Sequence, residues 1–438
     1  MAAQEPVGSD PAAIALAVVG QFEAGEFDHA YARFSPQLKE LAQSATVAEL
    51  WRGHLGRGTT LTRGDVTLRS RADGLVTATV PVRTELGGIE VLMSVDADGI
   101  VHGLRFAVAP GDEWSKPAYA SSRRFAEHEV AIRAGDDAVP GTVTLPRGRS
   151  RLSARMSGGA PAVVLLAGGG PFDRDESAGP NKPLKDLAWG LATRGVAVLR
   201  FDKPTFVHAE KFNERGLGFT LADEYVPHAA AAVRLLQNYD AVDRNRIFVL
   251  GHSAGGKAAP LVAQAEPSVA GLILLAADAA PMHETAVRVA RHVAALDPGP
   301  QTEAALAQLT EQAARAADPE LDPLTPATRL PFGLPAAYWL DLGRYDPVGT
   351  AASLGKPMFI AQGGRDYQVT AEHDLALWQE GLRGRSDAAS RVYPGADHLF
   401  FPGSEPATPD SYQTAQHVDR RLVQDVATWI RQGGRVRR

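Results

Sequence analysis

The chain has 438 residues, a length typical of two or three domains. Its 45 Lys and Arg against 51 Asp and Glu give a formal net charge of −6, so a nucleic-acid partner is not expected. It contains no cysteine, which excludes disulfides, cysteine–zinc sites, iron–sulfur clusters and a thiol nucleophile. No segment reaches the ~18 consecutive apolar residues of a membrane helix, and no basic region opens the chain. We therefore expect no membrane partner and a cytoplasmic location.

The first hundred or so residues predict a small α+β domain. Apolar spacing predicts helices over Ala12–Gly25, over Phe27–Ala42 with a break at Pro36, and over Val47–Leu55 with Thr46 as N-cap. Alternation then predicts strands over Asp65–Arg71, Leu75–Glu85, Ile89–Val95 and Ile100–Val108. Helices followed by antiparallel strands are typical of an α+β domain, expected here over residues 10–110 and followed by a linker over 111–126.

From about residue 127 the pattern changes to short apolar strands that alternate with helices. A hairpin of Glu127–Arg133 and Gly141–Leu145 comes first. Strands are then predicted over Ala162–Leu166, Val196–Phe201, Ile247–Leu250, Leu272–Ala276 and Met358–Ala361. Helices are predicted over Lys182–Arg194, Leu221–Asn238, Gly255–Gln264, Ala371–Gly381 and Val418–Arg431. Such alternation indicates an α/β domain with a parallel sheet, expected over 127–434. An insertion at about 281–347, with helices over Thr285–Leu296 and Glu303–Ala317, reads as a lid.

The sequence around Ser253 is the strongest indication of function. The strand over Ile247–Leu250 runs into Gly251-His252-Ser253-Ala254-Gly255, and a helix follows. This is the G-x-S-x-G pattern in a strand–turn–helix context, which lifts a serine hydroxyl clear of a sheet at a helix N-terminus. Ser253 is therefore the candidate nucleophile. His252 beside it is expected to be a buried packing residue rather than a second base.

A nucleophilic serine needs a base and an acid that orients the base, in the hydrolase order serine, acid, histidine. Asp366 follows the strand over Met358–Ala361, and His398 follows a later short strand and turn. Because the carboxyl ends of parallel strands meet at one edge of a sheet, we expect Ser253, Asp366 and His398 to converge as a catalytic triad.

Other interpretations compete with parts of this one. Asp278 or Asp397 is an alternative orienting acid, and Asp397 ranks lower because it adjoins the histidine. The spacing from Gly251 to Lys257 resembles a phosphate-binding P-loop. That loop needs Ser or Thr after the lysine to hold magnesium, and the residue here is Ala258.

The anionic oxygen of a tetrahedral intermediate needs N–H donors. One is expected from Ala254, the residue after the nucleophile, and the other from the glycine loop after an early strand. In that loop Gly169 is the preferred donor and Gly170 the second choice. A dinucleotide fingerprint counted from Gly168 would need a glycine at Asp173, so it is not favoured.

Four segments carry a resemblance to a known family: 165–175 (LLAGGGPFDRD), 251–256 (GHSAGG), 362–369 (QGGRDYQV) and 393–400 (YPGADHLF). From about residue 127 to 432 the chain resembles α/β-hydrolases of the serine aminopeptidase and dienelactone-hydrolase-like group. In such enzymes the nucleophile, acid and histidine fall at Ser253, Asp366 and His398. Relatives often carry His-Gly where this chain has Ala167-Gly168, so we expect the oxyanion loop to be braced differently here. Residues 10–108 are similar to a small uncharacterised bacterial domain of cystatin or nuclear-transport-factor-like shape.

The expected function is hydrolysis of a small-molecule carboxylic ester or lactone through an acyl-enzyme, with no metal and no organic cofactor. Phe172, His252, Tyr338 and Trp339 are candidates for the substrate pocket. Two alternatives use the same triad: an aminopeptidase or amidase, and an acyltransferase or thioesterase-type biosynthetic enzyme. A binding protein with vestigial catalytic residues is a third. The N-terminal domain has three open roles: covering the active-site entrance, binding substrate, or forming a homodimer.

Overall fold

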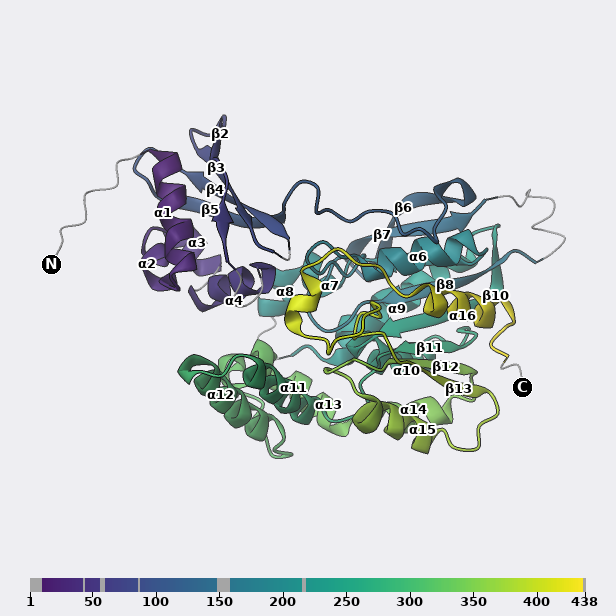
Figure 1. Cartoon of the computed structure of the whole chain (residues 1–438). Coiled ribbons are helices and arrows are strands. Elements are labelled where there is room, and N and C mark those ends of the chain that lie inside the picture. The colour runs from purple at the N-terminus through teal and green to yellow at the C-terminus, as the bar shows by residue number, and fades with distance from the viewer. Residues whose placement is uncertain are drawn as a thin grey trace. The chain divides into compact units, whose positions relative to one another are not determined.

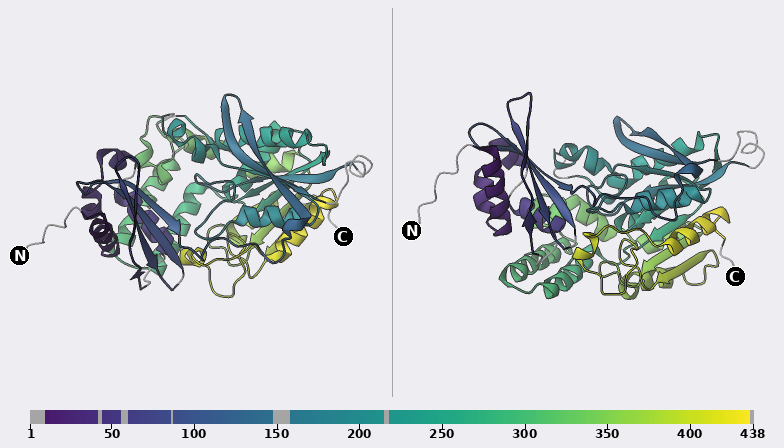
Figure 2. Two further views of the ribbon diagram at one scale, coloured as in Figure 1. Left: turned by 90° about the horizontal axis from the view of Figure 1, so that it is seen from above. Right: turned by 45° about the horizontal axis from the view of Figure 1, so that its top comes forward.

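The computed structural model describes residues 10–41, 44–55, 60–85, 87–147, 158–214 and 218–435. The chain divides into two compact units. The first contains the residues up to Ser115 together with two short later segments, Ala178–Asn181 and Thr408–Gln416. The second contains the rest. Figures 1 and 2 show the elements of each unit.

The first unit packs helices on one face of an antiparallel sheet. Its helices are α1 (Pro11–Glu23), α2 (Phe27–Ala32), α3 (Pro36–Leu41) and α4 (Ser44–Leu55). Its strands are β1 (Thr62–Arg63), β2 (Thr67–Ser70), β3 (Val76–Arg83), β4 (Gly88–Val95) and β5 (Val101–Val108). The strand order is β1-β3-β4-β5, with β2 also paired to β3. Alternate residues of β4 are buried, and Phe22 of α1 contacts Phe27 and Trp51, so the core lies between the sheet and the helices.

The second unit is built on an eight-stranded sheet of order β13-β12-β11-β10-β8-β9-β7-β6. The strands are β6 (Phe125–Ala134), β7 (Asp137–Pro146), β8 (Ala160–Leu166), β9 (Ala197–Phe201), β10 (Val242–His252), β11 (Leu272–Leu275), β12 (Met358–Gly363) and β13 (Ala388–Tyr393). The hairpin of β6 and β7 is antiparallel, and the other strands run parallel. Every residue of β8 is buried, as expected for a strand covered on both faces.

Helices cover both faces of this sheet (Figure 1). On one face α6 (Pro183–Thr193) packs against α16 (Arg420–Arg431). On the other, α9 (Leu221–Gln237), α10 (Ala254–Ala265), α14 (Pro347–Ser353) and α15 (Ala376–Gly381) pack in sequence. The short helices α7 (Pro204–Val207) and α8 (Ala209–Glu214) follow β9. Between β11 and α14 the chain inserts α11 (Met282–Leu296), α12 (Pro300–Ala316) and α13 (Ala336–Arg344). This is the segment predicted to interrupt the alternation.

Two local predictions differ from the structure. Helix α4 begins at Ser44, so Thr46 lies inside the helix rather than at its N-cap. The segment Ala371–Leu375 is a π-helical turn ahead of α15, with Thr370 as its cap, rather than the start of one regular helix. Within the ranges that the structure describes, no helix is both long and apolar enough to cross a bilayer.

Candidate active site

A strained turn carries Ser253 at the junction of β10 and α10. Its backbone has φ 51° and ψ −123°, a left-handed conformation that non-glycine residues seldom adopt. The flanking glycines make this turn possible. A Cβ on Gly251 would lie 2.1 Å from the carbonyl oxygen of Gly255, and a Cβ on Gly255 would lie 2.5 Å from the carbonyl oxygen of Ala167. The hydroxyl of Ser253 is therefore presented at the N-terminus of a twelve-residue helix, where negative charge is favoured.

Asp366 and His398 form a hydrogen-bonded pair after the ends of β12 and β13. His398 Nδ1 lies 2.8 Å from Asp366 Oδ2, and both residues are buried. Among the described residues, neither His398 Nε2 nor the Ser253 hydroxyl has a hydrogen-bond partner. The ring is therefore oriented by the carboxylate and keeps Nε2 available for a proton.

The alternative acids have other partners. Asp397 accepts the backbone N–H groups of Leu399 and Phe401, so it shapes its own loop. Asp278 forms an ion pair of 2.8 Å with Lys257. Lys257 is the lysine of the P-loop-like spacing. Because it is buried and paired with Asp278, it is not available to bind a phosphate.

The glycine loop after β8 lies beside the nucleophile. A Cβ on Gly168 would lie 3.3 Å from Ser253 Cβ, and one on Gly169 would lie 3.6 Å from Ala254 Cβ. Among the residues that the structure describes, no acceptor takes the backbone N–H of Gly169, Gly170 or Ala254. These N–H groups are free to bind an oxyanion, and an ester carbonyl attacked by Ser253 would develop its charge close to them.

A buried pair, Glu176 and His252, joins three parts of the site. Glu176 Oε1 accepts the Gly168 N–H at 2.7 Å and lies 2.8 Å from His252 Nδ1. His252 Nε2 donates to the backbone carbonyl of His398 at 2.9 Å. Burial lowers the pKa of His252, but the charge and hydrogen bond of Glu176 outweigh burial and raise this pKa above its usual value. The pair therefore ties the glycine loop to the turn of Ser253 and to the loop of His398.

A second buried group lies behind the glycine loop. Lys203 Nζ donates to the carbonyl oxygen of Gly168 at 2.8 Å and to the Tyr225 hydroxyl at 2.9 Å. It also forms an ion pair of 2.8 Å with Glu224. Burial lowers the pKa of Lys203, and the neighbouring Glu224 carboxylate offsets only part of this lowering. Where relatives often have an imidazole, this chain has the buried Ala167, and the loop is held by Glu176, Lys203 and Tyr225 instead.

The predicted pocket residues lie in different surroundings. Phe172 is half-buried, and its ring contacts the oxyanion loop, 3.3 Å from the position of a Cβ on Gly170. Tyr338 is buried against Phe219 and donates its hydroxyl to Glu224 at 3.0 Å. Trp339 is buried in the apolar cluster of the inserted segment. Of these aromatic side chains, only Phe172 enters the pocket proposed below.

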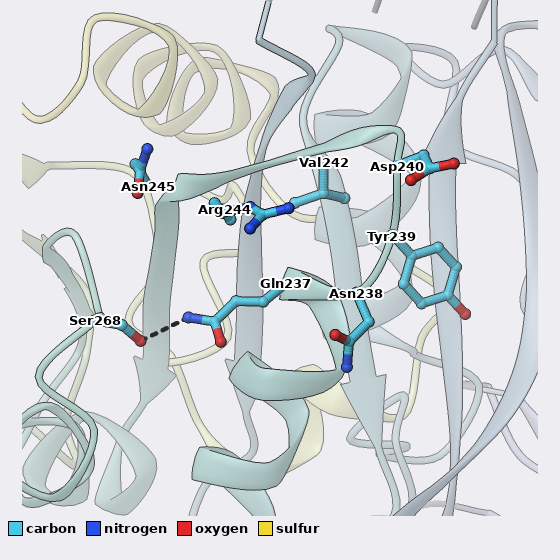
Figure 3. A pocket seen from close by; sticks show the side chains of 8 residues that line it. All are labelled: Gln237, Asn238, Tyr239, Asp240, Val242, Arg244, Asn245 and Ser268. Carbon is cyan, nitrogen blue, oxygen red and sulfur yellow. Dashed lines mark hydrogen bonds between the residues drawn. The ribbon is translucent and has the colours of Figure 1, made fainter. Parts of the chain in front are cut away.

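A surface hollow of about 800 Å³ lies away from this chemistry (Figure 3). Its lining is mostly polar and comes from the end of α9 and the start of β10, with Gln237 donating to Ser268 at 2.9 Å. Ser253 follows the opposite end of β10. None of the sequence-predicted site residues lines the hollow, and we assign it no role.

Several residues of the site were not singled out from the sequence. Glu176 directly follows the segment 165–175 that resembles the hydrolase family, and this adjacency is the only sequence feature that indicates a role in the site. Lys203 lies two residues after β9, at the same carboxyl edge of the sheet as Ser253. Gln362 donates to Asp366 at 3.1 Å and braces the acid from within β12. Glu176 and Lys203 meet His252 and Gly168 from 76 and 35 residues away, so no local spacing pairs them.

The eight-stranded sheet and the turn of Ser253 define an α/β-hydrolase. The sequence profile of the family described as serine aminopeptidase, S33, matches residues 182–405. The chain is also 34% identical over 349 residues to esterase EstD of Thermotoga maritima, a match that covers 80% of this chain and 78% of EstD. The chain therefore belongs to this family of hydrolases.

Two solved structures are examples of a similar fold. One is 2,6-dihydroxy-pseudo-oxynicotine hydrolase, at 19% identity and a TM-score of 0.42, covering 70% of this chain and 67% of that one. The other is Est1E from Butyrivibrio proteoclasticus, at 17% identity and a TM-score of 0.43, covering 70% of this chain and 98% of that one.

Proposed function

We propose that Ser253, His398 and Asp366 hydrolyse a carboxylic ester through a covalent acyl-enzyme. The single observation that supports the proposal is that His398, which is paired with Asp366, contacts His252, the residue next to Ser253, through a hydrogen bond of 2.9 Å and a ring contact of 4.7 Å. The reaction class follows from the family and from the 34% identity to an esterase: the chain is a carboxylic ester hydrolase.

In the proposed acylation, Ser253 Oγ attacks the ester carbonyl carbon while His398 Nε2 takes the hydroxyl proton. Asp366 holds the ring so that Nδ1 keeps its hydrogen, and it stabilises the imidazolium that forms. The N–H groups of Ala254 and Gly169 bind the oxyanion, with Gly170 as a further donor. The intermediate then collapses, the alcohol leaves with the proton from His398, and Ser253 carries the acyl group.

In the proposed deacylation, His398 takes a proton from water as the water attacks the acyl carbonyl. The tetrahedral intermediate again uses the loop N–H groups, and the acid leaves as Ser253 Oγ recovers its proton from His398. Atoms and charges therefore balance with water as the only second substrate.

The test is labelling by a fluorophosphonate together with turnover of a p-nitrophenyl ester. Wild type is expected to label and to turn over, and Ser253→Ala to lose both, with the rate falling by about 10⁶-fold, as a missing nucleophile does. Retention of labelling and turnover by Ser253→Ala would falsify the mechanism.

An amide substrate is the second candidate, because the matching family is described as serine aminopeptidase. The same triad would have to protonate an amine leaving group, which is a harder step than release of an alcohol. Comparing an aminoacyl anilide with the matched aminoacyl ester separates the two functions. We expect the ester to have much the larger kcat/KM.

The remaining parts of the proposal concern the surroundings of the site. Phe172 is offered as one wall of the pocket, and the inserted segment of α11 to α13 as a lid that selects a small-molecule ester or acyl substrate. For the first unit, helices packed on an antiparallel sheet support the cystatin or nuclear-transport-factor-like shape. A cytoplasmic location and the absence of nucleic-acid and membrane partners stay predictions, as does a homodimer.

A further inference from the structure

Lys203 is a buried ammonium with three polar partners. It donates to the carbonyl oxygen of Gly168 at 2.8 Å and to the Tyr225 hydroxyl at 2.9 Å, and it forms an ion pair of 2.8 Å with Glu224 Oε1. The side chain is only 3% exposed. A lysine is seldom buried this deeply, because the charge loses its hydration. Glu224 alone would neutralise the charge, so the contact with Gly168 calls for a separate explanation.

The carbonyl of Gly168 belongs to the same peptide unit as the N–H of Gly169. This peptide unit is trans, so its C=O and N–H bonds point in opposite directions. The carbonyl is held by Lys203 and also by the Tyr225 hydroxyl at 2.8 Å. The Gly169 N–H therefore points away from Lys203 and the Tyr225 hydroxyl. The loop lies against Ala254, the residue that supplies the other proposed donor.

Hydrogen bonds to a carbonyl also strengthen the N–H of the same amide. A donor at the oxygen draws electron density from nitrogen, and the effect is larger inside a protein than in water. Here one of the two donors is an ammonium, and charged donors form the stronger bonds. Glu224 balances the net charge, while the N–H dipole of Lys203 still acts on Gly168 at contact distance.

We propose that Lys203 and Tyr225 are positioning residues of the oxyanion hole, which orient the Gly168–Gly169 peptide and polarise its N–H toward the substrate oxyanion. The inference rests on the proposed function, because it concerns the donor that the reaction would use. It also accounts for a loop that works without an imidazole at Ala167.

The experiment compares a p-nitrophenyl ester with its thionoester, in which sulfur replaces the carbonyl oxygen. A sulfur anion accepts hydrogen bonds weakly, so the ratio of the two kcat values reports how strongly the oxyanion hole acts. Removing a whole donor lowers kcat by about 10²–10³-fold, so weakening one by Lys203→Met should lower the ester-to-thionoester ratio by about tenfold, with KM little changed. Tyr225→Phe should lower the ratio by a smaller factor.

Matched variants separate positioning from a loss of folding. Lys257→Met removes another buried lysine from an ion pair in the same unit, without a contact to Gly168, and should leave the ratio unchanged. Lys203→Met leaves the buried Glu224 carboxylate without its cationic partner, so the double variant Lys203→Met/Glu224→Gln removes that charge as well. Tyr225→Phe keeps the packing of the ring and removes only the hydroxyl.

A fall in the ratio in any folded variant at Lys203 or Tyr225, with Lys257→Met unchanged, supports the inference. An unchanged ratio in both Tyr225→Phe and the double variant overturns it, as does an equal fall in Lys257→Met. Loss of ester turnover in Ser253→Ala shows that the proposed function itself stands in either case. If Ser253→Ala keeps its turnover, the proposed function fails first.

Discussion

Both carboxylate oxygens of Asp366 accept hydrogen bonds. Oδ1 accepts the backbone N–H groups of Gln368 and Val369 at 2.8 and 2.9 Å. Oδ2 faces His398 Nδ1 at 2.8 Å and Gln362 Nε2 at 3.1 Å. The group is buried yet satisfied, so its position is fixed without support from solvent. Its oxygens can accept but not donate, and His398 must therefore keep a hydrogen on Nδ1.

Replacing this acid should disable the histidine without disturbing the backbone. In Asp366→Asn, an amide can donate to Nδ1 and favour the wrong tautomer, so kcat for a p-nitrophenyl ester should fall by about 10⁴-fold. Asp397→Asn is the control, because the carbonyl oxygen of Asn can still accept the two N–H groups of its loop. Equal losses in the two variants would rule out Asp366 as the orienting acid.

The Glu176–His252 pair makes a prediction about pH. The folded-state pKa of His252 is raised above its unfolded value of about 6.5, so its contribution to stability is complete below that pH. The contribution is then lost as pH rises through the folded pKa. The difference in unfolding free energy between wild type and Glu176→Gln should therefore be larger at about pH 6 than at about pH 9.

Chemical denaturation of both proteins at each pH measures this difference. Glu311→Gln is the control, because Glu311 is exposed and pairs with an arginine that stays charged over the whole range. Its difference from wild type should not change with pH. If the difference in unfolding free energy between wild type and Glu176→Gln stays constant or grows as pH rises, Glu176 and His252 do not form a charged pair.

For single residues, the sequence predicts those that belong to motifs, but it does not predict the residues that hydrogen-bond to the motifs from elsewhere in the chain. Ser253 and Ala254 are marked by glycines at fixed spacing, and Asp366 and His398 by their place after apolar strands. Glu176 meets its partner His252 from 76 residues away, and Lys203 meets Gly168 from 35. Such contacts depend on the order of strands in the sheet, which no local spacing encodes.

The junction of β10 and α10 shows how two elements share one turn. Gly251, Gly255 and Gly256 each lie against backbone or Cβ atoms of a neighbouring segment. A side chain at these positions would push the first turn of α10 away from β8 or β11. The close approach allows Ser253 to keep its unusual positive φ of 51°.

Two glycine variants compare a crowded position at this junction with an open position elsewhere. Gly251→Ala would bring a methyl group to 2.1 Å from Gly255 O, so we expect destabilisation by ~3 kcal/mol or more and loss of turnover. Gly343 is an exposed position of α13, where a Cβ would meet nothing within 4 Å, so Gly343→Ala should stabilise by about 0.5–1 kcal/mol. Thermal unfolding of both variants checks the opposite signs, and two changes of the same sign would contradict the argument.

The elements themselves are mostly predictable, and their irregular ends are not. Fully apolar runs identify β8 and β11, because these strands are covered on both faces. The π-helical turn at Ala371–Leu375 has the same apolar spacing as an ordinary helix, so periodicity does not reveal it. Helix α4 extends back to Ser44 past Thr46, since a good cap residue is also tolerated inside a first turn.

On the scale of the molecule, the first unit is completed by segments from much later in the chain. Asn181 is fully buried, donates to the carbonyls of Tyr412 and Thr414, and accepts the N–H of Gln416. Gln413 donates in turn to the carbonyl of Gly53 in α4. Segments of four and nine residues carry no pattern of their own, so a domain predicted over residues 10–110 does not include them.

Asn181 should therefore matter more to stability than a polar side chain usually does. Asn181→Ala removes three hydrogen bonds between a buried side chain and backbone groups of the late segment, and we expect destabilisation by about 2–4 kcal/mol. Asn245→Ala is the control at an exposed position, and should stay within about 0.5 kcal/mol of wild type. Denaturant titration measures both, and equal effects would mean that Asn181 does not hold these segments.

These late segments have a consequence for biosynthesis. A ribosome releases residues 1–115 long before residues 408–416 exist, so the first unit emerges with part of its final packing still missing. The nascent first unit therefore stays incompletely packed until nearly the whole polypeptide has been translated. The earliest part of the protein to be made is thus among the last to be finished.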